Sequence, residues 1–225
     1  MVSHSIIEPL SSIWWIGLGS SLIIIVLALL FFKNLSSALK AKSSKLLSTS
    51  FILVYLITTI TAIQSGSWNI HDNLPLHLCR ISFFISIIVL LTQKQWMYEW
   101  TLYLAIPSGF HSMLTPELTM GWNNWYLFDY YFVHGALIFV PLYLTIVMGM
   151  RARANAWKHT FYRLQLAVLL ILPLNFVIDS NYMYLKAKPI VENPLLIGDW
   201  PFYILFLELI VLIHILIIHK LSPKK

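Results

Sequence analysis

The chain has 225 residues, of which 59% are hydrophobic and 11% are charged. Soluble domains carry about 25% charged residues, so this composition excludes an ordinary soluble protein. Apolar runs recur along the whole length, which predicts one polytopic membrane domain over residues 1–225. The formal net charge of +6 is then an orientation signal, and we expect no nucleic-acid partner. The single cysteine, Cys79, excludes an intrachain disulfide and a CxxC metal or redox motif.

Seven apolar segments have the length of a membrane-spanning helix. A helix needs about 20 residues to cross roughly 30 Å of hydrocarbon. We therefore expect an all-α, seven-helix membrane protein with these spans: Ile13–Phe32, Leu46–Ile63, Pro75–Leu91, Met97–Leu114, Phe128–Met148, Phe161–Ile178 and Trp200–Ile218. The first segment is long and lacks the cationic lead of a cleavable signal peptide, so we expect a permanent anchor.

Positive charges alternate between the connecting segments. Twelve of the fifteen cations fall on one predicted side: Lys33, Lys40, Lys42, Lys45, Lys94, Arg151, Arg153, Lys158, Arg163, Lys220, Lys224 and Lys225. Lys186 and Lys188 lie in a loop on the other side, and Arg80 lies just inside the third span. The positive-inside rule predicts an N-terminus outside the cell, a cytoplasmic C-terminus and a location in the plasma membrane.

Polar side chains gather at one predicted depth. At about 1.5 Å per helical residue, Cys79 lies about 6 Å and His134 about 9 Å below the outer ends of their spans. Three other spans bring further polar residues to the same outer third: His111, Asn175, Asp179 and Glu208. Three prolines inside the spans free carbonyls that can line a cavity: Pro107, Pro141 and Pro173. Because such groups are costly in hydrocarbon, their shared depth predicts a pocket facing the outer leaflet.

Each of the polar residues in or near the spans could also have a purely structural role, with no part in a reaction. A buried cysteine is most often a small apolar packing residue, an intramembrane histidine can be a packing residue, and Arg80 can extend towards headgroups. Asp129 and Glu99 lie near span ends, where we expect them to be solvated. Asp179 or Glu208 could pair with Arg80 in a structural role.

The combination of groups at one depth nevertheless favours a nucleophilic site. A thiolate is a strong nucleophile, and a nearby imidazole and guanidinium favour the anion over the thiol. His134 or His77 could act as the base and then as the acid. An outer-leaflet pocket meets the acyl esters of phospholipids, so we expect acyl transfer through a thioester on Cys79. The acceptor would be a lysophospholipid hydroxyl or water, and no cofactor is expected.

Four ordered motifs between about residues 65 and 218 carry a resemblance to a known family. They are LPLHLC at 74–79, FVHG at 132–135, NYMYL at 181–185 with Lys188-Pro189, and WPFY at 200–203. This set resembles the YwaF-type integral membrane proteins, which group with the eukaryotic transmembrane protein 164 proteins. The resemblance implies a heptahelical fold, distantly similar to the Thr–His fatty-acid ester hydrolases of the androgen-induced type. It also implies a phospholipid acyltransferase with Cys79 as nucleophile and His134 as its partner.

Six further residues are expected to orient the histidine or to hold a phosphate: His77, Arg80, His111, Asn175, Asp179 and Asn181. Arg80 suits a phosphate because its guanidinium is a planar fork of donors. Two other classes of protein remain open. A metal or haem protein would draw its ligands from the set His77, His111, His134 and Asp179. A non-enzymatic transporter or small-ligand-binding protein would use the same polar layer, although no inverted repeat is visible.

Overall fold

The computed structural model of the chain describes residues 4–191 and 195–224. The helices of this part are α1 (Ser12–Lys33), α2 (Ser37–Gln64), α3 (Leu78–Thr92), α4 (Gln95–Trp100), α5 (Ile106–Leu114), α6 (Asn124–Ile146), α7 (Ala156–Val177) and α8 (Phe202–Leu221). A π-helix, η1 (Thr101–Ala105), joins α4 to α5, and a 3-10 turn, η2 (Tyr182–Tyr184), follows α7. Two short antiparallel strands, β1 (Ser5–Ile6) and β2 (Glu117–Leu118), pair near the N-terminus. Lys225, one of the cations counted for topology, lies outside the described residues.

The helices follow the predicted segments closely, with shifts at their ends. α2 begins nine residues before the predicted span, where the Ser36 side chain accepts a hydrogen bond from the backbone N–H of Leu39. α6 begins four residues early, where Asn123 caps the backbone N–H of Trp125. α3 begins three residues late, so Cys79 is its second residue and does not lie a full turn inside it. The predicted fourth span is the composite of α4, η1 and α5.

The π-helix η1 accommodates Pro107 within this composite segment. Proline lacks an N–H and its ring clashes with the preceding turn of an α-helix. The wider π turn ends two residues before Pro107, which lies in the first turn of α5, where a missing N–H costs little. Pro141 and Pro173 lie inside α6 and α7, as the sequence predicts.

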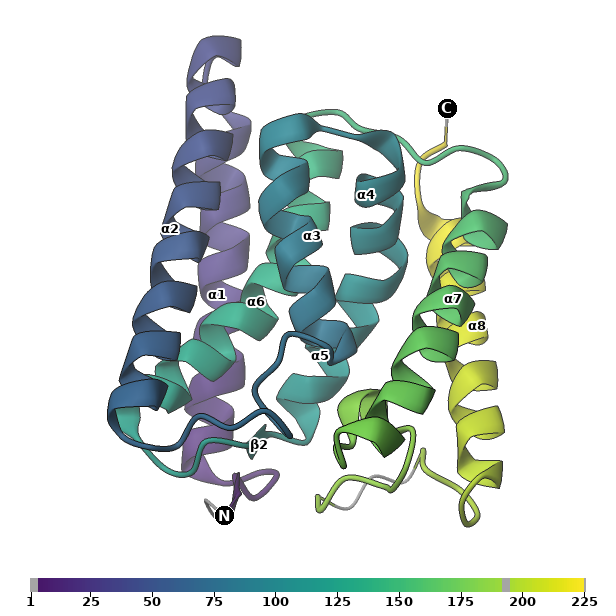
Figure 1. Ribbon diagram of the computed structural model, residues 1–225. Helices are drawn as coiled ribbons and strands as arrows, with labels where there is room; N and C mark the ends of the chain where they lie inside the picture. Colours follow the sequence, from purple (N-terminus) through teal and green to yellow (C-terminus); the bar gives the residue numbers. More distant parts are fainter. Residues whose placement is uncertain (1–3, 192–194, 225) are drawn as a thin grey trace.

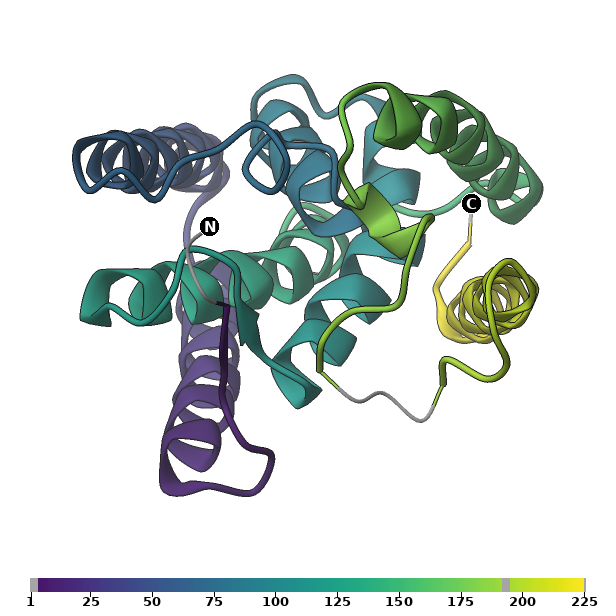
Figure 2. The ribbon, with the colours of Figure 1, turned by 60° about the horizontal axis from the view of Figure 1, so that its bottom comes forward.

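The helix α6 crosses the middle of the helix bundle (Figure 1). The most apolar part of α6 is 72% buried, against 22% or less for the corresponding parts of α1, α2, α7 and α8. α1 and α2 lie on one side of it, and α7 and α8 lie on the other side, beyond α3, α4 and α5 (Figures 1 and 2). The N-terminus lies at the same end as β2, and the C-terminus lies at the opposite end (Figure 1).

Length and surface composition identify a membrane protein. Five helices of the described chain are long and apolar enough to cross a bilayer, namely α1, α2, α6, α7 and α8, and α3 is a shorter apolar helix of 15 residues. Large apolar side chains such as Ile16 and Leu205 are more than 60% exposed. Since such surfaces need lipid around them, the predicted all-α, multi-pass membrane class is confirmed.

Two acidic residues that we expected to be solvated are buried. Glu99 is 0% exposed, and both of its carboxylate oxygens accept hydrogen bonds from the Arg153 guanidinium, at 2.8 and 2.6 Å. Asp129 is 1% exposed. The prediction for Asp129 is wrong because α6 begins four residues early, which places this carboxylate in its second turn, facing other helices.

Candidate functional site

A cavity of about 320 Å³ lies between two groups of helices. Residues of α3, α5 and α6 line one side, and residues of α7, α8 and the segment after η2 line the other. The cavity wall is mainly apolar, with ionisable side chains projecting from several helices. Of the predicted site residues, Cys79, His134, His77, Arg80 and His111 all line it.

Cys79 lies at the N-terminus of α3 and faces α5. Its thiol donates a weak hydrogen bond to the carbonyl oxygen of Ser108, with sulfur and oxygen 3.9 Å apart. The Ser112 hydroxyl lies 3.3 Å from the sulfur. The partial positive charge of a helix N-terminus favours a thiolate, and the Ser112 hydroxyl can donate to that anion. Burial opposes the charge, so removal of the proton requires a base inside the cavity.

His134 lies on α6, five residues after Asp129. Its Nδ1 is 2.7 Å from the carbonyl oxygen of Tyr130, one turn earlier. Only a protonated Nδ1 can donate to a carbonyl, which fixes the neutral tautomer with a free lone pair on Nε2. Nε2 is the nitrogen that a general base needs.

Ser112 and Tyr130 connect the thiol to the imidazole. The Tyr130 hydroxyl donates to the carbonyl oxygen of Ser112 at 2.6 Å. The Tyr130 and His134 rings contact each other, with centroids 4.2 Å apart. A side chain at Gly109 would lie 2.6 Å from the carbonyl oxygen of His134, so α5 and α6 approach closely only because this residue is glycine. The close approach brings α5, which carries Ser112, against the His134 turn of α6.

The remaining predicted histidines in the cavity have defined partners. His77 precedes α3, and its Nδ1 accepts a hydrogen bond from the backbone N–H of Met183 at 3.2 Å. His111 Nε2 lies 3.1 Å from Nε2 of His214 on α8, whose Nδ1 donates to the Ile210 carbonyl. We did not single out His214 from the sequence. Its signal was available, because an ionisable residue in the middle of an apolar span is itself a functional candidate.

Arg80 pairs with a residue that the sequence did not suggest. Its Nη2 lies 2.8 Å from Oδ2 of Asp129, and Thr58 donates to the other oxygen of the same carboxylate at 3.0 Å. The predicted partners are wrong: Asp179 pairs with Lys186, and Glu208 accepts a hydrogen bond from Gln165 at 2.6 Å. Since Asp129 lies on α6 and Arg80 on α3, the ion pair joins the helices that carry the histidine and the thiol.

Three predicted supporting residues do not line this cavity. Asn175 is fully buried and bonds to both backbone groups of Tyr182, which holds the η2 turn. Asn181 accepts hydrogen bonds from the backbone N–H groups of Lys186 and Ala187 in the following loop. Asp179 is exposed, and the Lys186 ammonium holds the pKa of its carboxyl below the usual range. These residues shape the loop after α7 and do not contact the thiol.

Metal binding by the predicted histidines finds no support in their arrangement. Within residues 4–191 and 195–224, no three His, Cys, Asp or Glu side chains are placed to hold one ion. Asp179, a member of the predicted set, lies at the surface beside Lys186.

The fold and the cavity together define a multi-pass helical membrane protein with a partly open cavity between its helices. A family model described as the TMEM164 family matches residues 7–219. Because this match covers nearly the whole chain, the protein belongs to that family, and the resemblance carried by the four motifs is confirmed. No curated protein and no solved structure matches the chain.

Proposed function

We propose that this protein is a phospholipid acyltransferase or acyl-ester hydrolase that works through a thioester on Cys79. The observation that carries the proposal is the shared cavity of Cys79 and His134, with Ser112 and Tyr130 connecting them. The apolar remainder of the cavity wall suits acyl chains. The tautomer of His134 supplies a base where burial makes one necessary.

The first half of the proposed reaction forms the thioester. His134 Nε2 takes the proton from the Cys79 thiol as the sulfur attacks the carbonyl carbon of a phospholipid ester. The carbon–oxygen bond of the tetrahedral intermediate then breaks, and His134 returns the proton to the departing glycerol oxygen. The products are a lysophospholipid and an acyl group on Cys79.

The second half transfers the acyl group to an acceptor. A lysophospholipid hydroxyl, or water, gives its proton to His134 and attacks the thioester carbonyl. The carbon–sulfur bond breaks, and the imidazolium reprotonates the thiolate. The Ser112 hydroxyl stabilises the sulfur in the steps where it carries negative charge, and the Tyr130 carbonyl holds the proton of His134 on Nδ1.

Acyl trapping tests this function. Purified protein is incubated with a phospholipid carrying a labelled acyl chain, and hydroxylamine-sensitive label is measured on the protein. We expect label on the parent chain, none on Cys79→Ala and little on His134→Ala. His159→Ala is the matched control, because His159 is exposed at the start of α7 and should label normally. Equal labelling of the parent chain and Cys79→Ala would overturn the proposal.

We also propose seven spans with the N-terminus outside the cell, in the plasma membrane. The alternation of cations supports this orientation, as does the placement of the two termini at opposite ends (Figure 1). In a Cys79→Ala background, Trp122→Cys should react with an impermeant maleimide added to intact cells, and Lys224→Cys should react only after lysis. The reverse pattern would contradict this topology.

The alternative is a transporter or a small-ligand-binding protein that catalyses no reaction. The observation that favours it is the cavity itself, whose His111–His214 contact joins α5 to α8 without taking part in the proposed reaction. Stoichiometric binding of lipid with no hydroxylamine-sensitive label on any cysteine-containing variant would favour this alternative.

A further inference from the structure

Two histidines from different helices meet at the wall of the cavity. His111 lies on α5 and His214 lies on α8, and both side chains line the cavity between the two groups of helices. Their Nε2 atoms are 3.1 Å apart. Ionisable side chains within apolar spans are costly and mark functional sites. The proposed acyl transfer uses neither ring, so the pair calls for a separate explanation.

A hydrogen bond between two neutral rings is the simplest interpretation of this contact. Nδ1 of His214 donates to the carbonyl oxygen of Ile210 at 2.7 Å, so Nε2 of His214 carries a lone pair and His111 would be the donor. The ring centroids are 5.0 Å apart, which is shorter than an end-to-end contact of two imidazoles would give. The ring axes are therefore bent away from the line between the nitrogens, which weakens a hydrogen bond.

The same geometry suits two ligands of one metal ion. Zinc binds histidine nitrogen at about 2.0–2.1 Å. At that distance, two nitrogens 3.1 Å apart subtend an angle of about 100° at the ion, which is close to a tetrahedral angle. The two Nε2 atoms are thus already spaced for coordination, and no helix has to move to bring them together.

The other nitrogen of each ring is also compatible with coordination. A histidine that binds a metal ion through one nitrogen almost always donates from the other to a carbonyl or a carboxylate, which orients the ring. His214 has this arrangement, with Nδ1 donating to Ile210. Nδ1 of His111 has no hydrogen-bond partner within residues 4–191 and 195–224, so it can take the proton that Nε2 gives up when an ion binds.

We propose that His111 and His214 bind one divalent transition-metal ion of the zinc class through their Nε2 atoms. Imidazole ligands favour zinc, copper and nickel over magnesium and calcium, which prefer oxygen. No third His, Cys, Asp or Glu of the described residues joins the pair, so the remaining positions are open to water or to an anionic oxygen of a molecule in the cavity. The ion links α5 to α8, and so joins the two groups of helices beside the cavity.

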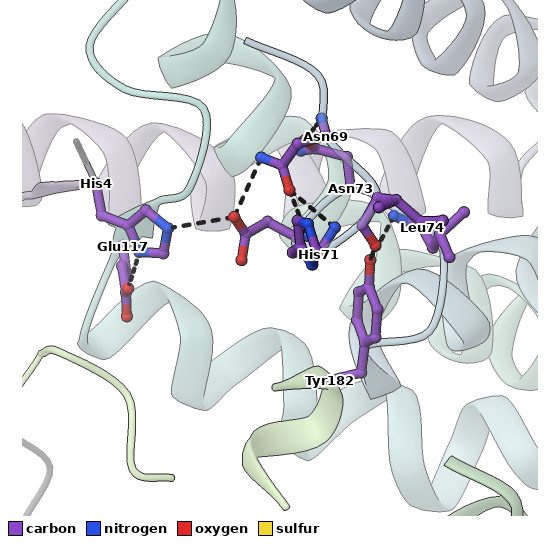
Figure 3. A network of polar contacts seen from close by, with 9 residues as sticks. His4, Asn69, His71, Asn73, Leu74, Glu117 and Tyr182 are labelled. Carbon is purple, nitrogen blue, oxygen red and sulfur yellow. Dashed lines mark hydrogen bonds and ion pairs between the residues drawn. The ribbon is translucent and has the colours of Figure 1, made fainter. Parts of the chain in front are cut away.

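His4 offers the best comparison, because it also has ionisable partners but lacks this geometry. Its Nδ1 is 2.6 Å from Glu117, and its Nε2 is 3.9 Å from Asp72 (Figure 3). The two nitrogens of one ring point in different directions, so His4 cannot bring both carboxylates to one ion together with its own nitrogen. A histidine between two carboxylates is therefore a control for weak binding of a cation at the surface.

Zinc titration of the Cys79→Ala protein tests the site without the thiol as a competing ligand. The protein is purified in detergent without a histidine tag, and zinc and magnesium chloride are titrated by calorimetry. We expect one zinc ion per chain, no detectable heat from magnesium, and a zinc-dependent rise in the temperature of thermal unfolding. Absence of stoichiometric zinc binding would overturn the proposal.

Four variants in the same Cys79→Ala background assign the ligands. His111→Gln and His214→Gln each remove one imidazole, and each should weaken zinc binding more than about 10-fold. His4→Gln and His159→Gln should bind zinc as the background protein does, since His4 lies between carboxylates and His159 is exposed at the start of α7. Zinc binding that persists in both His111→Gln and His214→Gln, or that is lost in His4→Gln, would overturn the assignment.

X-ray absorption of zinc bound to the parent chain tests the ligands without any substitution. We expect nitrogen and oxygen neighbours near 2.0–2.1 Å, with the outer-shell scattering of two imidazole rings. This measurement decides the matter even if a histidine variant fails to fold. A sulfur neighbour at about 2.3 Å would place the ion on Cys79 and would overturn the proposal. None of these measurements depends on acyl transfer, so the metal site and the proposed function can fail separately.

Discussion

Arg80 on α3 and Asp129 on α6 form an ion pair in which Nη2 and Oδ2 are 2.8 Å apart. The carboxylate side chain is 2% exposed and also accepts a hydrogen bond from Thr58 on α2. A single carboxylate therefore joins three helices at the cavity. The pair neutralises a guanidinium that would otherwise be a lone cation beside the thiol of Cys79.

Removal of Asp129 alone should destabilise the protein strongly. Asp129→Ala leaves the Arg80 charge without its partner, and breaking a buried pair in this way costs about 3–5 kcal/mol. The double variant Arg80→Met, Asp129→Leu should lose less than Asp129→Ala, since neither charge remains. Unfolding in detergent by denaturant measures both losses. A double variant that is less stable than Asp129→Ala would contradict this account.

Gly109 should be intolerant of a side chain. The Cβ of Gly109→Ala would lie 2.6 Å from the carbonyl oxygen of His134, so α5 and α6 must separate. Overpacking of this kind costs about 1–3 kcal/mol, and we expect acyl labelling of Cys79 to fall because Ser112 moves with α5. Gly19→Ala on α1 is the control, since no atom lies within 4 Å of its added carbon. Equal stability and labelling of the two variants would show that the close approach is unimportant.

The Ser112 hydroxyl should contribute to thioester formation. Its oxygen is 3.3 Å from the sulfur of Cys79, and a hydrogen bond to a charged group is worth about 1.5–3 kcal/mol. Ser112→Ala should slow acylation about 10- to 100-fold in a single-turnover labelling experiment.

Ser108→Ala gives the matched comparison for Ser112. Ser108 contacts the sulfur through its backbone carbonyl, while its hydroxyl donates to Ala105. The variant keeps that carbonyl, so its labelling rate should stay close to that of the parent chain. A similar rate loss in both variants would indicate a general disturbance of α5.

Asn175 should be essential for the η2 turn and dispensable for the chemistry. Its side chain bonds to the backbone N–H and carbonyl of Tyr182 and accepts from Ser180. Asn175→Ala leaves these groups buried and unpaired, at a cost of about 2–4 kcal/mol. Thermal unfolding should show the loss, and the labelling rate of the protein that remains folded should be unchanged. Asn181→Ala, in the more exposed part of the loop, should cost less.

Membrane class and helix positions could be predicted because hydropathy is a local property. Each of the apolar segments is helical over most of its predicted length, and the boundaries differ where a cap such as Asn123 begins the helix early. The motifs that contain Cys79 and His134 identified the family, which the match over residues 7–219 confirms.

The predicted partners of Arg80 failed because they depend on how the helices face one another. Depth placed Asp179 level with Arg80, but depth does not determine which way a side chain faces around its helix axis. Asp179 follows α7 and lies at the surface, whereas Asp129 faces α3 from the second turn of α6. The contact of His214 with His111 likewise depends on α8 lying beside α5, although His214 itself stands out in the sequence as an ionisable residue within an apolar span.

The sequence by itself determined that this is a helical membrane protein of the TMEM164 family, and it predicted a cysteine and a histidine at similar depths. Crossing the hydrocarbon layer requires long apolar helices, so the membrane class and the helix positions follow from local runs of sequence. Only the tertiary structure decided that Asp129 pairs with Arg80, and that contacts through Ser112 and Tyr130 link Cys79 to His134. These contacts depend on the rotation and lateral order of the helices, which are set by packing between residues far apart in the sequence.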